Sequence, residues 1–156
     1  MFGLRHRGGE VVDVRPAADY AAGHLKGSLA IPLRGVFATW LGWLLPDPDA
    51  PIVIVRNPDQ DPEEIIWQAR KVGYSRIVGE LAGGVAAWAT AGEALQATPL
   101  ADPARVDPAT VVDVRQRSEY AAGHVPGARN VELGVVDAAT LPDLSLIHIS
   151  EPTRPH

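Results

Sequence analysis

The residues best placed to do chemistry follow a short apolar stretch in the first half of the chain. Ile52-Val-Ile-Val55 contains four β-branched residues and no polar one. This pattern predicts a central strand of a parallel sheet covered on both faces. Ligands of such sheets bind just beyond the carboxyl ends of the strands. That position holds no thiol, hydroxyl or imidazole that could act as nucleophile or base, only Arg56, Asn57, Pro58, Asp59, Gln60 and Asp61.

A helix should begin directly after this loop. Asp61 is a good N-cap, Pro62 suits the first helical position, and Glu64 stands three residues past the cap. Apolar residues then recur at helical spacing until Gly73, which predicts the helix end. The loop and first turn carry four carboxylates against one arginine, and prolines remove two N–H donors. We therefore expect the loop to repel anions.

Three other residues could shape a pocket beside Arg56. Asp13 and Arg15 lie two apart on a predicted strand, so they share a face, and we interpret them as a structural ion pair. His24 could face a ligand, but a hydrogen bond to backbone in the turn between Gly23 and Gly27 is favoured. Arg56 could hold a carboxylate or phosphate, or form an internal salt bridge to Asp59 or Asp61.

The five histidines are scattered and lack the spacing of metal ligands. The sequence therefore predicts no metal site and no cofactor.

Strands and helices alternate around this loop. Strands are predicted at 11–15, 29–31 and 77–81, and an apolar helix at 36–45 should be buried on most sides. Gly83-Gly84 predicts a tight turn into a short helix over 85–91, with Trp88 in the core. The alternation indicates an α/β fold with an open parallel sheet and right-handed crossovers. The remaining tryptophans suit either core packing or an exposed contact patch: Trp40, Trp43 and Trp67.

The chain repeats itself at an offset of one hundred residues. Residues 11–33 recur as 111–133, with twelve of the twenty-three positions identical. The sequence therefore predicts two copies of one unit. We divide it into a first domain (1–92) with a truncated N-terminal edge, a linker (93–108) and a truncated second copy (109–143). No counterpart of the strand at 52–55 follows residue 133, so the second copy is expected not to bury a core of its own.

The last residues, 144–156, read as the in-frame translation of a sequencing-library adapter. We interpret them as an artefactual tail that takes no part in the fold. His148 and His156 carry no functional weight for that reason.

Several motifs in order resemble the rhodanese homology domain. They are Val11-Val-Asp-Val-Arg15, then Asp19-Tyr-Ala-Ala-Gly-His-Leu-Lys-Gly27, then the loop at Arg56, then Glu80-Leu-Ala-Gly-Gly-Val-Ala-Ala-Trp88. The resemblance implies a three-layer α/β/α fold on a parallel sheet, followed here by an incomplete second copy. It also implies that active members carry sulfane sulfur on a cysteine in this loop and transfer it from thiosulfate or a persulfide to a thiol or cyanide. Arg56 stands at that position.

A narrower resemblance concerns the arrangement of the two copies. The degenerate loop, the helix before Pro51 and the second copy are similar to the C-terminal half of metallo-β-lactamase-fold hydrolases fused to rhodanese domains, relatives of persulfide dioxygenases. The favoured function is a catalytically inactive structural or protein-interaction unit, present as a fragment of a larger sulfur-metabolism protein. The alternatives are an active sulfurtransferase, or a metal-dependent hydrolase or persulfide dioxygenase activity in the intact parent.

Composition narrows the classes of partner. The formal net charge is −5, so no basic face is available for nucleic acid or an anionic membrane. The chain has no cysteine, which excludes disulfides, thiolate metal sites and thiol catalysis. Its longest apolar run, 36–45, is too short to span a bilayer. We expect a cytoplasmic protein whose partner is another protein or the parent's N-terminal domain.

Overall fold

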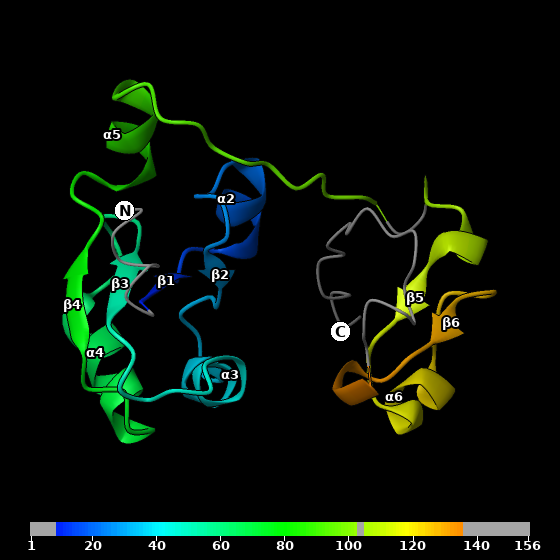
Figure 1. Cartoon of the computed structure of the whole chain (residues 1–156). Helices are drawn as coiled ribbons and strands as arrows, with labels where there is room; N and C mark the ends of the chain where they lie inside the picture. The colour runs from blue at the N-terminus through cyan, green and yellow to red at the C-terminus, as the bar shows by residue number, and fades with distance from the viewer. Residues whose placement is uncertain (1–8, 103–104, 136–156) are drawn as a thin grey trace. The chain divides into compact units, whose positions relative to one another are not determined.

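The computed structural model describes residues 9–102 and 105–135 and divides the chain into two compact units, the first ending at Thr98 and the second beginning at Pro99. The first unit holds a four-stranded parallel sheet in the order β2-β1-β3-β4 (Figure 1). Its strands are β1 (Glu10–Asp13), β2 (Leu29–Ala30), β3 (Ile52–Val55) and β4 (Ile77–Glu80). The predicted α/β fold with a parallel sheet is confirmed, and β3 is an inner strand.

One face of this sheet carries the core of the first unit. Val12 of β1 stands opposite Ile54 of β3, and both side chains belong to the same buried cluster. Helices α3 (Phe37–Leu44) and α4 (Pro62–Lys71) contact each other and supply the rest of that cluster. Tyr74 and Leu45 belong to the same cluster, and the Tyr74 hydroxyl donates a hydrogen bond to the carbonyl of Leu45. These contacts fix β3, and with it the loop that follows.

Helix α3 is less buried than its apolar sequence predicts. Phe37 and Leu41 are buried, as is Leu45 directly after the helix, because these positions share one helical face. Trp43 is 72% exposed and Leu44 is 45% exposed. The prediction of a helix buried on most sides was therefore wrong, since only the stripe facing the sheet is covered.

Helix α4 begins as the sequence predicts. The side chain of Asp61 accepts a hydrogen bond from the backbone N–H of Glu63 at 2.9 Å, and Pro62 is the first helical residue. Glu63 and Glu64 fill the first turn, where negative charge is favourable against the helix dipole. The carboxylates after β3 therefore stabilise the helix start.

The turn between β4 and α5 (Gly84–Thr90) requires glycine. Gly83 has a φ of 69°, and a Cβ there would lie 2.6 Å from the Cβ of Ala87. The predicted strand-to-helix turn is confirmed. Trp88 was predicted to be core but is only half-buried, because α5 covers the end of the sheet and buries no residue fully.

Helix α2 (Ala17–Ala22), which follows β1, was not predicted as a helix. It lies, like α5, at the end of the sheet where β1 and β4 finish (Figure 1). The segment after α5 returns to α2: His24 and Gln96 exchange backbone hydrogen bonds of 2.8 and 2.9 Å. Residues up to Thr98 thus pack with the first unit, whereas the sequence places its boundary at 92.

The second unit repeats the first strand-helix-strand segment. Strands β5 (Val112–Asp113) and β6 (Arg129–Asn130) are parallel and flank α6 (Arg117–Ala122), with short 3₁₀ turns at Pro108–Thr110 and Leu133–Val135. Among its described residues only Val111 and Ala128 are buried apolar side chains. The residues predicted as an artefactual tail, 144–156, lie outside the described part of the chain. No helix of the described residues is long and apolar enough to cross a membrane.

Candidate functional site

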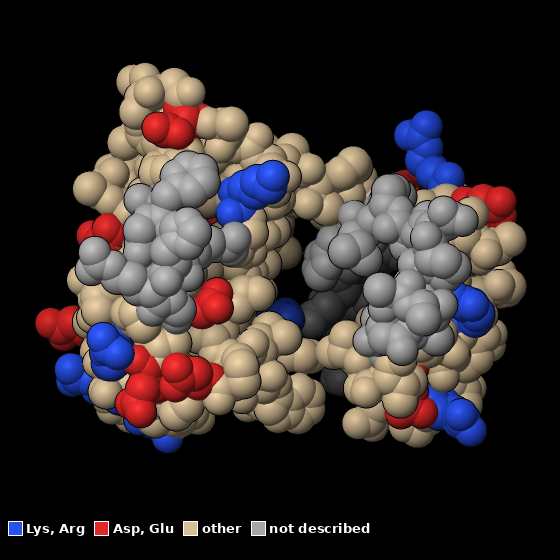
Figure 2. All heavy atoms as spheres, viewed as in Figure 1, with Lys and Arg blue, Asp and Glu red and all other residues tan. Residues whose placement is uncertain are grey.

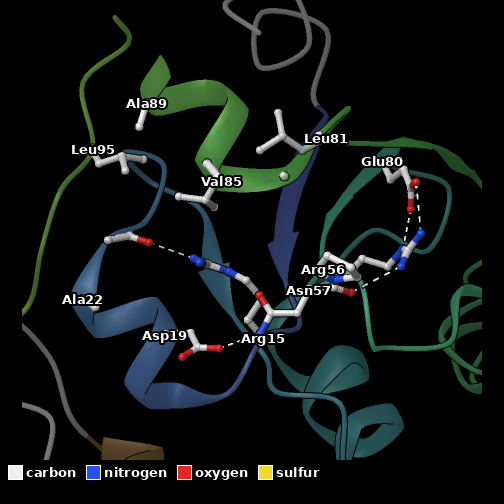
Figure 3. A pocket seen from close by; sticks show the side chains of 15 residues that line it. Arg15, Asp19, Ala22, Arg56, Asn57, Glu80, Leu81, Val85, Ala89 and Leu95 are labelled. Carbon is white, nitrogen blue, oxygen red and sulfur yellow. Dashed lines mark hydrogen bonds and ion pairs between the residues drawn. The ribbon is translucent and has the colours of Figure 1, made fainter. Parts of the chain in front are cut away.

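A cavity of about 620 Å³ opens at the carboxyl ends of β1, β3 and β4, between α2 and α5 (Figure 3). This is the edge at which the sequence places the candidate site. Small and apolar residues of α5 and of the chain after it form one wall, and polar residues from the strand ends form the floor. The lining comprises Arg15, Asp19, Ala22, Gly23, Arg56, Asn57, Pro58, Glu80, Leu81, Gly83, Gly84, Val85, Ala86, Ala89 and Leu95.

Arg15 on the floor of the cavity is bound to Asp13. Its Nε lies 2.9 and 3.2 Å from the two carboxylate oxygens, and its Nη2 lies 2.6 Å from Oδ2. Nη2 also donates to the carbonyl of Gly23 at 2.8 Å. The Asp13 side chain is fully buried and that of Arg15 is 7% exposed. The predicted structural ion pair is confirmed, and Asp13 neutralises the charge of Arg15 within the protein.

Arg56 forms its ion pair with a residue that the sequence did not suggest. Its Nε donates to Oε2 of Glu80 at 2.5 Å and its Nη2 to Oε1 at 3.2 Å. The predicted salt bridge to Asp59 or Asp61 was wrong, because β3 and β4 are neighbours and Ile54 stands opposite Glu80. The hydrogen bond from Arg56 to the Glu80 carboxylate raises the pKa of the Arg56 guanidinium above its ordinary value. The pair also borders a smaller cavity of about 300 Å³ between β4 and α4.

The loop after β3 is closed by its own side chains. The backbone N–H of Asn57 donates to Oε1 of Gln60 at 2.9 Å, and the Gln60 amide donates to the carbonyl of Val14 at 2.8 Å. Arg56 Nη1 donates to the carbonyls of Asn57 and Gln60 at 3.3 and 3.0 Å. Nδ2 of Asn57 donates to Oδ2 of Asp19 at 2.5 Å. The side chains of Arg56, Asn57 and Gln60 and the Asn57 N–H are therefore already paired within the protein.

His24 does not line the cavity. Its Nδ1 lies 2.9 Å from the carbonyl of Tyr20, to which it donates, and its ring stacks on the Tyr20 ring at 3.9 Å. The favoured hydrogen bond to backbone is present, but its acceptor belongs to Tyr20 of α2 and not to the turn between Gly23 and Gly27. Burial raises the pKa of the Tyr20 hydroxyl, which donates to the carbonyl of Ser28.

The structure brings together only part of the predicted site. Arg15, Arg56, Asn57 and Pro58 line the cavity, but Asp13 and His24 do not, and neither do Asp59, Gln60 and Asp61. The sequence did not indicate that Asp19, Glu80 or Leu95 would contribute. The Gly83-Gly84 turn was the signal for the α5 wall, because it places α5 directly beyond the end of β4. Among the described residues no cluster of three or more His, Asp or Glu side chains could hold a metal ion.

A family model of the rhodanese-like domain matches the chain twice, over residues 3–91 and over residues 96–153. The chain belongs to the rhodanese-like family. A search of curated proteins gave no match.

One solved structure supports the fold, and two others are more distant. The rhodanese-like domain of the Alr3790 protein from Anabaena sp. superposes with a TM-score of 0.53 and 24% identity, over 60% of this chain and 97% of that one. A further structure of that domain gives a TM-score of 0.49, 25% identity and coverage of 61% and 92%. Thiosulfate sulfurtransferase from Pseudomonas aeruginosa gives 0.45 and 22%, over 82% of this chain and 31% of that one.

This rhodanese-like chain has no cysteine that could serve as the sulfur carrier implied by the resemblance. It contains no cysteine at all, and Arg56 stands where the resemblance implies the sulfur-carrying cysteine. Because the guanidinium of arginine stays protonated, it cannot take over as a nucleophile. No residue that lines the cavity can carry a cysteine persulfide.

Proposed function

We propose that this rhodanese-like chain is a catalytically inactive structural or protein-interaction unit of a larger sulfur-metabolism protein. One observation carries the proposal: Arg56 replaces the cysteine and is held by Glu80 in a two-point ion pair. The loop thus has a structural role in joining β3 to β4. The alternative, a thiosulfate or persulfide sulfurtransferase, has no thiol in this chain with which to work.

The loop is also electrostatically unsuited to thiosulfate. An anion site needs backbone N–H groups or cations that are free to bind. Here the N–H of Asn57 is bound to Gln60, Arg56 to Glu80, and Arg15 to Asp13. An incoming anion would compete with carboxylates for both arginines and with the Gln60 amide oxygen for the Asn57 N–H. This supports loss of sulfur-donor binding as well as loss of the nucleophile.

A protein is the partner class that the surface favours. On the face drawn in Figure 2, the Lys and Arg side chains of the described residues are separated by acidic and uncharged ones, which is unlike a nucleic-acid or membrane surface. Trp43 on α3 is 72% exposed and Trp67 on α4 is 60% exposed. Exposed tryptophans are typical of protein contacts. We therefore extend the proposal to a protein partner.

The parent protein and the finer architecture belong to this proposal too. The tandem match to the family model and the resemblance to metallo-β-lactamase-fold fusions support a parent with metal-dependent hydrolase or persulfide dioxygenase activity in another domain.

Burial on both sheet faces supports the three-layer fold: Val12 and Ile54 pack with α3 and α4, and Val11 and Val55, which point to the opposite face, are buried as well. The strand-helix-strand repeat supports an incomplete second copy.

The test restores the missing thiol. We expect Arg56→Cys to form no more thiocyanate from thiosulfate and cyanide than the matched control Arg56→Ser. The new thiolate would stand beside Glu80, left without its cation, and near Asp19, so its pKa would rise and its thiolate fraction would fall. Turnover by Arg56→Cys well above Arg56→Ser would show that the loop is still competent. Turnover by the unaltered chain would refute inactivity outright.

A further inference from the structure

The charges around the main cavity leave one carboxylate without a cation. Four charged side chains line it: Arg15, Asp19, Arg56 and Glu80. Arg15 is neutralised by Asp13, which lies outside the lining, and Arg56 is neutralised by Glu80. No Lys or Arg of the described residues forms a salt bridge with Asp19, whose Oδ2 accepts only a neutral amide, that of Asn57. The cavity therefore carries a net negative charge at Asp19.

The opposite wall of the cavity is apolar. It is built by Leu81, Val85 and Ala89 of the β4–α5 segment and by Leu95 (Figure 3). A ligand that suits both parts has an aliphatic stem of several carbons and a positive head. Lysine and arginine side chains have this shape, since they bury the stem on apolar surface and keep the charge at its tip.

We propose that this cavity is a docking site for a lysine or arginine side chain of a partner protein, with the charged head at Asp19 and the stem on the α5 wall. The inference rests on the proposed interaction function and names the chemistry of the partner. It reverses the charge preference expected of a site for a sulfur-donor anion. The reversal follows because both arginines are paired within the protein, so the Asp19 carboxylate is the charge of the cavity that is not neutralised.

The test is NMR titration of the full chain with three small probes. Nα-acetyl-lysine methylamide should shift backbone amide signals of residues lining the cavity. Nα-acetyl-norleucine methylamide, which keeps the four-carbon stem of lysine and lacks the charge, should bind about fivefold more weakly, as expected for one partly exposed ion pair. Nα-acetyl-glutamate methylamide should cause no shifts at the cavity. Equal binding of the lysine and norleucine probes, or preference for the glutamate probe, would overturn the proposal.

Matched variants locate the effect. Asp19→Asn keeps an oxygen that can accept from Asn57 and should weaken the lysine probe about fivefold, whereas Asp59→Asn, outside the lining, should not. Ala89→Phe, at an exposed position of α5, should weaken both the lysine and norleucine probes by filling the apolar wall. Unchanged lysine binding in Asp19→Asn would refute the site. Sulfur transfer is not measured here, so failure of this proposal is distinct from failure of the inactivity proposal.

Discussion

Replacing Arg15 by methionine should destabilise the first unit strongly. Arg15→Met keeps a long side chain but leaves the fully buried Asp13 carboxylate without its cation. It also removes the donor to the carbonyl of Gly23. Breaking a buried pair by removing one partner costs about 3–5 kcal/mol, since the remaining charge is uncompensated. Such a loss is a large fraction of the stability of a small domain, which is about 5–15 kcal/mol.

The second unit supplies a matched control. Arg115 holds Asp113 with the same hydrogen bonds, 3.0, 3.2 and 2.6 Å, but its side chain is 38% exposed and that of Asp113 is 10% exposed. Water can solvate the remaining carboxylate there, so Arg115→Met should cost about 1 kcal/mol or less.

Tryptophan fluorescence during urea unfolding separates the two variants. All four tryptophans, Trp40, Trp43, Trp67 and Trp88, belong to the first unit. With a slope of about 1.5 kcal/mol per molar urea, Arg15→Met should lower the midpoint by about 2–3 M, and Arg115→Met should leave it unchanged. A shift below about 0.5 M for Arg15→Met would refute the assigned burial cost. An equal shift for Arg115→Met would show that the midpoint does not report the Arg15–Asp13 pair specifically, and would refute the reasoning too.

Two further predictions concern the loop and the second unit. Gln60→Ala should cost about 1–3 kcal/mol and speed hydrogen exchange at the Asn57 amide at least tenfold, because it leaves that N–H without its acceptor. The Val14 carbonyl loses one of its two hydrogen bonds and keeps the one from the Leu33 N–H. Unchanged exchange by NMR would contradict the loop network. Hydrogen bonds from Arg115 hold the pKa of Asp113 below its ordinary value, so their stabilisation is present above the unfolded-state pKa and is lost as pH falls through the lower folded-state pKa. A carbon-13 carboxyl titration should show this pKa rising in Arg115→Met, and an unaltered pKa would refute the cause.

The sequence predicts the elements better than their burial. The strand at 52–55, the Asp61 cap and the Gly83-Gly84 turn were all recognisable, because each is specified by local residue types. Helix α3 was misjudged since hydrophobicity alone does not say which helical face meets the sheet, and this leaves Trp43 exposed.

The partner of Arg56 was beyond sequence reasoning for a similar reason. Glu80 is 24 positions downstream, and only the pairing of β3 with β4 brings the two side chains together. Nearby Asp59 and Asp61 were the obvious candidates by sequence distance, but Asp61 is engaged as the cap of α4. The pairing of β3 with β4 therefore decided which carboxylate neutralises Arg56 at the cavity. Sequence distance does not reveal such a pairing.

The motifs shared by the two copies form the same hydrogen bonds in both units. In the second unit Arg115 Nη2 lies 2.8 Å from the carbonyl of Gly123, as Arg15 Nη2 does from that of Gly23. The Tyr120 hydroxyl donates to the Ala128 carbonyl at 2.7 Å, which repeats the 2.8 Å bond from Tyr20 to Ser28.

This geometry recurs although the described residues of the second unit contain no counterpart of β3 and its loop. The Asp-x-Arg and Tyr-Ala-Ala-Gly-His motifs therefore build the corner between a strand, a helix and the next strand, independently of any nucleophile. Such a corner can form in a chain without a cysteine, because its stability comes from its own ion pair and hydrogen bonds. Membership of the family is consequently evidence for the fold, and the residue at position 56 is the evidence on activity.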